Sequence, residues 1–170
     1  HVVSVCDVDE ARLKDAKARV DEQNASKGLN IECIATTKYE DIIARDDIDA
    51  VCIATPDHWH AIPTVAALRS GKDVYCEKPL THNIFEAITV IDEVEKNDRV
   101  LQTGSMQRSS KEFRVACELV RNGVIGEIER VECNFGDPGV PCDLPEEEME
   151  PGLDWERWLG PAPERPYHSI

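Results

Sequence analysis

Apolar runs of strand length alternate with amphipathic stretches between residues 2 and 103. Within the amphipathic stretches apolar side chains recur at helical spacing, as Leu13, Ala16 and Val20 do. The runs between them are apolar almost throughout, which is typical of parallel strands covered by helices on both faces of a sheet. The pattern therefore predicts a doubly wound α/β fold. The expected strands are residues 2–6, 31–35, 50–54, 73–76 and 100–103, and the expected helices are residues 9–22, 39–44, 59–69 and 82–96.

The pattern changes after Gly104. Residues 111–121 have helical spacing and are followed by an Asn-Gly pair, which is typical of a helix C-terminus. Residues 127–135 alternate polar and apolar side chains, which predicts a strand with one solvated face. We therefore expect residues 1–121 to form the first domain and residues 122–170 to begin a second.

The charge balance of the chain excludes some classes of binding partner. The 170 residues include 34 acidic and 19 basic side chains, so the formal net charge is −15. Nucleic acids and anionic membranes are bound through Lys and Arg, so neither is an expected partner. No apolar stretch approaches the roughly 20 residues that a membrane-spanning helix needs.

Seven cysteines are present, with no CxxC spacing. Cys6, Cys33, Cys52 and Cys76 lie in apolar runs, where a free thiol behaves as a small buried hydrophobic group, so we expect them to be reduced and in the core. The acidic run at residues 143–150 lacks the spacing of a calcium-binding loop and is interpreted as a solvated loop. No metal site is expected.

Asp7 directly follows the first apolar run. In a dinucleotide-binding unit, an acidic residue that ends the second strand binds the adenosine ribose hydroxyls and disfavours the 2′-phosphate of NADP. Alternatively, Asp7 caps the helix that begins near Asp9. The glycine-rich phosphate loop is expected about 20 residues before such an acid, and no GxGxxG occurs in the sequence. Either Asp7 is a capping residue, or the sequence starts after the first strand and its loop.

The turn at residues 54–60 reads Ala-Thr-Pro-Asp-His-Trp-His and leads from a buried strand into a helix. Ligands of open α/β sheets bind at such carboxyl ends of strands, so the turn is a candidate site in which His60 is favoured over His58. In the alternative interpretation, Trp59 packs under the helix and both histidines are at the surface. Metal binding by the pair is disfavoured, because residues two apart on a helix do not face each other.

Glu77, Lys78 and Pro79 follow the strand at residues 73–76. A lysine at the carboxyl end of a strand can orient a substrate hydroxyl, and the bond before Pro79 can adopt the cis geometry. A solvated surface lysine is the alternative, but the position at the ligand-binding edge of the sheet favours a functional Lys78.

These segments together resemble the Gfo/Idh/MocA oxidoreductases, the family of glucose-fructose oxidoreductase and inositol dehydrogenase. The resemblance extends over nearly the whole chain and rests on TPxxxH, EKP and NGxIG in this order. The segments that carry it are AVCIATPDHWHAIPTVAALRSGKDVYCEKPLTHN, LQTGSMQRSS, ELVRNGVIGEIERVE and GLDWERWLGPAPERPY.

The resemblance implies an N-terminally truncated Rossmann-like domain and the start of an α+β domain with an antiparallel sheet. It implies that NAD is the cofactor, with NADP less favoured, and that Asp7 binds the adenosine ribose. Thr55 and Pro56 would line the dinucleotide, with His60 close to it.

For the other end of the cofactor, the resemblance implies that Glu77 and Lys78 lie beside the nicotinamide and that Pro79 follows a cis bond. Lys78 would be the catalytic residue that hydrogen-bonds the hydroxyl to be oxidised. Gln107 and Arg108 would lie near a sugar-like substrate.

The chain departs from the family pattern at both ends. It has no glycine-rich loop at its start, and the family's Asp/His catalytic pair has no match, since His168 is not in that motif. In the strand order 3-2-1-4-5-6 the absent first strand lies at the centre, so we expect a split sheet, weak cofactor binding and poor stability of this fragment.

The resemblance implies hydride transfer between a nicotinamide cofactor and a secondary alcohol of a sugar, cyclitol or sugar derivative. The alternatives are a glycoside-cleaving relative that oxidises its substrate transiently, and a non-catalytic nucleotide- or sugar-binding module. We expect the parent protein to be a homo-oligomer that is either cytoplasmic or exported through a twin-arginine signal.

Overall fold

The structure, a computed structural model, describes residues 1–170 except residues 138, 142 and 170. The chain divides into two compact units. Residues 1–104 and 145–170 form the first unit, and residues 105–144 form the second. Each is described by itself.

The strands of the first unit pair in parallel but form two separate sheets. One sheet pairs β1 (Ser4–Cys6) with β2 (Ile34–Thr36). The other has the order β3 (Ala50–Ile53), β4 (Asp73–Cys76), β5 (Leu101–Thr103). The expected parallel α/β class is confirmed. The expected split of the sheet is also observed, between β1 and β3, which correspond to the second and fourth strands of the doubly wound order.

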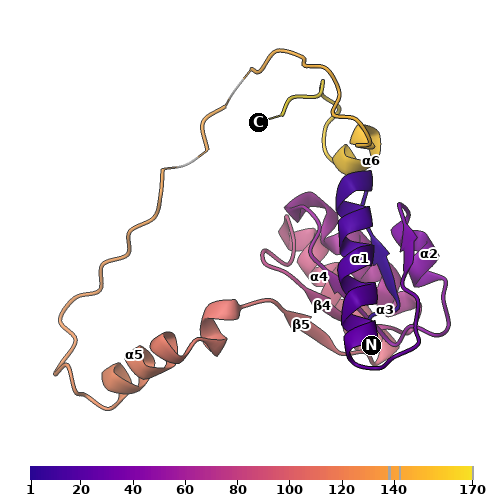
Figure 1. Ribbon diagram of the computed structural model, residues 1–170. Helices are drawn as coiled ribbons and strands as arrows, with labels where there is room; N and C mark the ends of the chain where they lie inside the picture. The colour runs from indigo at the N-terminus through magenta and orange to yellow at the C-terminus, as the bar shows by residue number, and fades with distance from the viewer. Residues whose placement is uncertain (138, 142, 170) are drawn as a thin grey trace. The chain divides into compact units, whose positions relative to one another are not determined.

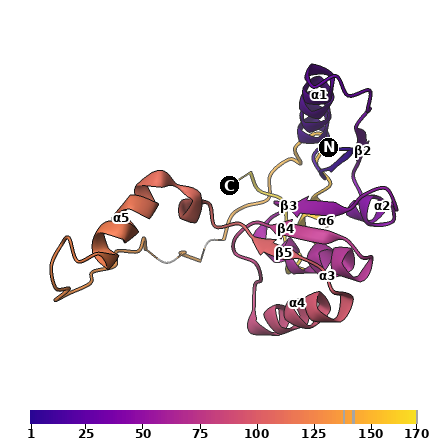
Figure 2. The ribbon, with the colours of Figure 1, turned by 90° about the horizontal axis from the view of Figure 1, so that it is seen from below.

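Helices follow the strands in the expected alternation. α1 (Glu10–Ser26) contacts both strands of the first sheet, and Asp9 caps it by accepting hydrogen bonds from the amides of Ala11 and Arg12. After β2 comes α2 (Tyr39–Ile43), and after β3 come the short 3₁₀ turn η1 (Asp57–Trp59) and α3 (Ala61–Arg69). α4 (Ile84–Asn97) packs against α3 on one side of the β3–β4–β5 sheet (Figure 2).

The hydrophobic core of the first unit lies between this sheet and its helices. Leu68 and Ala67 of α3 are fully buried against Ile53, Val74 and Cys76 of the strands. Because burial of a side chain such as Leu68 stabilises the fold by about 1.5–3 kcal/mol, this layer fixes the positions of β3 and β4.

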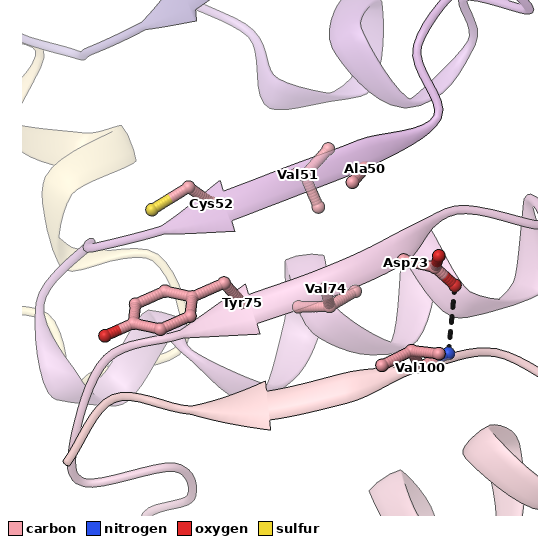
Figure 3. Close-up of a pocket in the computed structure, with 7 residues that line it drawn as sticks. All are labelled: Ala50, Val51, Cys52, Asp73, Val74, Tyr75 and Val100. Carbon is pink, nitrogen blue, oxygen red and sulfur yellow. Dashed lines mark hydrogen bonds between the residues drawn. The ribbon is translucent and has the colours of Figure 1, made fainter. Parts of the chain in front are cut away.

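The opposite face of the β3–β4–β5 sheet is not covered within the described part of the first unit. A shallow hollow there is lined by Ala50, Val51, Cys52, Asp73, Val74, Tyr75 and Val100 (Figure 3). Within the first unit helices therefore cover one face of this sheet, and the expected cover of its other face remains a prediction. On this open face Cys52 is exposed, and Cys6 in the other sheet is half-buried, so neither lies in the core as expected, whereas Cys33 and Cys76 are buried as expected. All six described cysteines are free.

Residues 145–169, here called the C-terminal strap, pack against the start of the first unit. Leu153 forms an antiparallel bridge with Asp9, and the short helix α6 (Trp155–Leu159) follows it (Figure 1). The expected assignment of residues 122–170 to a second domain remains a prediction, but the contacts of the strap are with the first unit.

The second unit contains the 3₁₀ turn η2 (Met106–Ser109) and α5 (Lys111–Arg121), the latter with the expected bounds. The strand expected at residues 127–135 is not formed, and these residues are exposed. A strand needs a hydrogen-bonding partner, and no described residue pairs with this segment. None of the described helices has the length and apolar character needed to cross a membrane.

Candidate functional site

The carboxyl edge of the β3–β4–β5 sheet brings together three of the predicted segments. Ile53, Cys76 and Thr103 are aligned across the three strands. Just beyond them the ladder continues, because the Glu77 amide donates to the Ile53 carbonyl (2.9 Å) and the Gly104 amide to the Cys76 carbonyl (2.7 Å). The turns that start at Ala54, Glu77 and Gly104 therefore leave the sheet side by side, where ligands of open α/β sheets bind.

Glu77 is held at this edge by its neighbours. Its carboxylate accepts hydrogen bonds from the Tyr75 hydroxyl (3.3 Å) and the Lys78 amide (3.3 Å). It also lies directly over Gly104, where a Cβ atom would be 2.6 Å from Glu77 Oε2. Only glycine at position 104 leaves room for the carboxylate in this place.

Gly104 was not among the residues predicted for the site. The sequence offers one signal, a glycine that directly follows a strand, but a single glycine does not reveal what approaches it. The approach of Glu77 becomes visible only when β4 and β5 are adjacent.

Lys78 and Pro79 extend outward from the same edge. Both are exposed, and the peptide bond between them is cis, as predicted. The Lys78 ammonium group is therefore accessible to a ligand bound at the edge of the sheet.

In the turn after β3, Thr55 is exposed and Pro56 half-buried, so both can contact a ligand at this edge. His60 differs from them, since only 1% of it is exposed. Its Nε2 atom lies 2.8 Å from the Thr55 carbonyl, and its Nδ1 atom lies 2.5 Å from the Pro79 carbonyl. Both ring nitrogens already have backbone partners. His60 can therefore lie close to a dinucleotide, as predicted, but it has no free nitrogen with which to bind one.

Asp7 lies at the end of β1, in the other sheet. It is half-buried, and its Oδ1 atom accepts the Asp9 amide (3.0 Å). The capping of α1 itself is performed by Asp9, so the alternative in which Asp7 serves as the cap is not what the structure shows. Burial, with the neighbouring Asp7 carboxylate, raises the pKa of the Cys6 thiol to about 11.

The strap is anchored to the turn after β3 by His58 and Trp59 of η1. The Trp158 carbonyl accepts hydrogen bonds from Trp59 Nε1 (2.9 Å) and from His58 Nε2 (2.8 Å). The Trp155 and Trp158 rings stack at 4.8 Å. The alternative, with Trp59 under the helix and both histidines at the surface, is not what the structure shows, because Trp59 packs against the strap and His60 is buried.

The strap also meets the turn that carries Asp7. The Asp154 amide donates to the Val8 carbonyl (3.0 Å), and the Glu10 amide donates to the Gly152 carbonyl (3.0 Å). Arg157 pairs with Glu40 of α2 (3.1 Å). These contacts hold the strap beside the start of α1 and beside α2.

Gln107 and Arg108 lie in η2 of the second unit, and both are exposed. Because they belong to the second unit, their place near the substrate remains a prediction. In the described residues no group of three or more His, Cys, Asp or Glu side chains is arranged to hold a metal ion.

The residues present fit the two ends of a dinucleotide. Asp7 offers a carboxylate to a ribose at the end of β1, whereas Glu77 and Lys78 offer a carboxylate and an ammonium group at the end of β4. The glycine-rich loop that would bind the pyrophosphate is not in the sequence. The parallel α/β unit and the polar residues at its carboxyl edges define a dinucleotide-binding domain of the Rossmann type.

Comparison with known proteins gives the family. The profile of the GFO_IDH_MocA oxidoreductase family, NAD-binding Rossmann fold, matches residues 1–105. The chain therefore belongs to this family, and the resemblance inferred from its motifs is confirmed.

Three relatives place the chain within the family. Inositol 2-dehydrogenase of Rhodococcus jostii is 35% identical over 102 residues, 59% of this chain and 28% of that protein. A glycosyl hydrolase family 109 protein of Shewanella sp. is 30% identical over 125 residues, 74% of this chain and 27% of that protein. The crystal structure of scyllo-inositol dehydrogenase from Lactobacillus casei with NAD(H) and scyllo-inositol matches with a TM-score of 0.57 and 28% identity, covering 74% of this chain and 34% of that one. The chain thus spans about a third or less of the length of these relatives.

Proposed function

We propose that the protein carrying this chain is an NAD-dependent dehydrogenase that oxidises a secondary alcohol of a cyclitol or sugar. The observation that carries the proposal is the exposed Lys78 beside Glu77 at the carboxyl edge of β4, in a chain similar to a dehydrogenase that binds NAD(H) and scyllo-inositol. Bound NAD would accept the hydride, since the cofactor supplies that chemistry and the protein supplies orientation.

Each residue of the site has a role that its position supports. Asp7 binds the adenosine ribose, and its charge favours NAD over NADP because it repels a 2′-phosphate. Thr55 and Pro56 line the cofactor. Glu77 lies beside the nicotinamide, fixed by Tyr75 and by the absence of a side chain at Gly104.

Lys78 is the proposed catalytic residue. Its ammonium group donates a hydrogen bond to the substrate hydroxyl, which holds the carbon–hydrogen bond toward the nicotinamide and stabilises negative charge that develops on oxygen. Gln107 and Arg108 contribute to substrate binding.

The test is an assay of the full-length protein with NAD or NADP and a panel of cyclitols and sugars. We expect absorbance of the reduced cofactor to increase with at least one polyol, and NAD to be preferred. No reduction of either cofactor with any member of the panel would contradict the proposal.

A second candidate is glycoside cleavage through transient oxidation of the sugar, favoured by the similarity to the family 109 glycosyl hydrolase. In that reaction the bound cofactor is reduced and then reoxidised, so sugar is released with no net formation of NADH. Measuring released sugar together with absorbance of the reduced cofactor separates the two reactions.

The assembly and location of the protein are also proposals. We infer a homo-oligomer acting on a small sugar-like molecule, located in the cytoplasm or exported through a twin-arginine signal. The excess of acidic side chains supports the absence of nucleic acid and membrane surfaces from its partners. Sedimentation of the full-length protein and the sequence upstream of residue 1 test the two inferences.

A further inference from the structure

His60 is almost fully buried at a place where its neighbours in the turn are exposed. It immediately precedes α3, whose first residue, Ala61, is also buried, as is Thr64 one turn later. A buried imidazole needs hydrogen-bond partners, because removing its nitrogens from water without compensation destabilises the fold.

The partners of His60 come from two different turns. The Thr55 carbonyl, five residues earlier, lies 2.8 Å from Nε2 in the turn after β3. The Pro79 carbonyl, 19 residues later, lies 2.5 Å from Nδ1 in the turn after β4. The imidazole ring therefore spans the two turns that leave the sheet on adjacent strands.

The chemistry of the contact makes His60 suitable for this place. Carbonyl oxygens only accept hydrogen bonds, and imidazole carries nitrogens on opposite sides of a rigid ring. In either neutral form the ring donates to one of the two carbonyls, and in the protonated form it donates to both. Since the ring has few rotatable bonds, the distance between the two carbonyls is set by its width.

We propose that His60 is a positioning residue for the proposed dehydrogenase: by bridging the Thr55 and Pro79 carbonyls, it holds the turn that carries Lys78 in register with the turn that lines the cofactor. The expected effect on turnover rests on the proposed function, whereas the contacts of His60 with the two carbonyls do not depend on it. His60 contacts neither cofactor nor substrate and acts through the backbone on either side of its ring.

The effect on catalysis follows from the location of Lys78. Pro79 directly follows Lys78, so release of the Pro79 carbonyl lets the Lys78 backbone move relative to the nicotinamide. A displacement of 1 Å in an active site can lower turnover by about 100-fold. We therefore expect a loss in kcat with little change in the affinity for NAD, whose ribose contact at Asp7 lies in the other sheet.

The kinetic test uses the full-length protein with His60→Ala, His60→Gln and the control His58→Ala. His58 lies on the same turn, but its ring contacts the Trp158 carbonyl. We expect kcat to fall by about 100-fold in His60→Ala, to recover in part in His60→Gln, which retains one donor, and to stay near the wild-type value in His58→Ala. The dissociation constant for NAD should change much less than kcat.

Two kinetic outcomes would overturn the proposal. One is a wild-type kcat in His60→Ala. The other is a loss of NAD affinity by the same factor as the loss of kcat, which would show that His60 acts on cofactor binding and not on the position of Lys78. Should His60→Ala fail to fold, the same comparison is made with His60→Gln.

A second measurement needs no turnover and so separates this inference from the proposed function. The carbonyl ¹³C NMR shifts of Thr55 and Pro79 report the hydrogen bonds that these oxygens accept. We expect at least one of the two shifts to change in His60→Gln, because the ring donates to one carbonyl in either neutral form, and neither to change in His58→Ala. Changed shifts in a protein without dehydrogenase activity would keep the bridge and reject the proposed function, whereas unchanged shifts would reject the bridge.

Discussion

The turns that carry Asp7 and Lys78 are assigned to opposite ends of the same cofactor, yet they are held in different ways. Besides a long bond from the Asp7 amide to the Thr36 carbonyl (3.4 Å), the Asp7 turn depends on the strap, through the bonds from Asp154 to Val8 and from Glu10 to Gly152. The Lys78 turn depends on its own sheet and on His60. The Asp7 end therefore depends on a segment more than 140 residues away in sequence, whereas the partners of the Lys78 turn lie within 27 residues of it.

The comparison predicts that damage at one turn leaves the other intact. Substitutions in the strap should affect the neighbourhood of Asp7, and substitutions at the edge of β4 should affect turnover.

Replacing Lys78 with Ala should lower kcat of the full-length protein by about 10²–10⁴-fold and leave the dissociation constant for NAD largely unchanged, because the ammonium group acts on the substrate hydroxyl. Steady-state kinetics and calorimetry with NAD measure the two quantities. Lys14→Ala, at an exposed position of α1, is the control. Unchanged turnover in Lys78→Ala would remove Lys78 from the mechanism.

Cys6 should react with iodoacetamide at pH 8 about 100-fold more slowly than a thiol of ordinary pKa, because the thiolate is the nucleophile and a pKa of about 11 leaves little of it. Its rate should rise with pH until the pH passes about 11. Mass spectrometry of the modified peptides gives the rates, with the exposed Cys133 as reference. Equal rates for the two cysteines would contradict the burial of Cys6.

Replacing Gly160 with Ala should destabilise the first unit by about 1–3 kcal/mol, as overpacking does. A Cβ atom at position 160 would overlap the Trp59 ring, and the φ of +46° also disfavours a side chain there. Thermal unfolding followed by tryptophan fluorescence measures the loss. Gly136→Ala, where the added atom meets nothing within 4 Å, is the control.

The Gly160 variant also tests the separation of the two turns. Loosening the strap should accelerate alkylation of Cys6 in β1 but leave the buried Cys76 in β4 protected. Equal acceleration of both cysteines would show that the two sheets loosen together.

Replacing Asp7 with Asn should reduce the preference for NAD over NADP by about tenfold, because the negative charge that repels a 2′-phosphate is lost. The amide oxygen can still accept the Asp9 amide, so the turn should persist. Dissociation constants for both cofactors measure the preference. Asp15→Asn, an exposed acid on α1, should leave it unchanged.

The sequence predicts those parts of the fold that depend on local pattern. β4 and α5 have the expected bounds, since an apolar run between turn residues and a helical stripe before Asn-Gly are sufficient to define them. The strand expected at residues 127–135 is not formed, because its prediction also rested on local pattern alone. Alternation defines which side chains could face a core, but a strand also needs a neighbour.

The residues of the candidate site could be predicted from the sequence, but the contacts between them could not. Thr55, Glu77 and Lys78 follow strands, and the ends of strands can be read from the sequence. The bridge made by His60, the approach of Glu77 to Gly104 and the exposure of Cys52 depend on which strands are adjacent and which face is covered. That information resides in residues far apart along the chain.

Trp59 and Gly160 meet so closely that neither position can change freely. A larger residue at 160 requires a smaller ring at 59, so in a double-mutant cycle Trp59→Phe should offset part of the damage of Gly160→Ala. Trp59 adjoins His60 in the chain, so the space at Gly160, far away in the sequence, limits which residues can stand beside the bridge. In evolutionary terms, positions 59 and 160 should therefore vary as a pair.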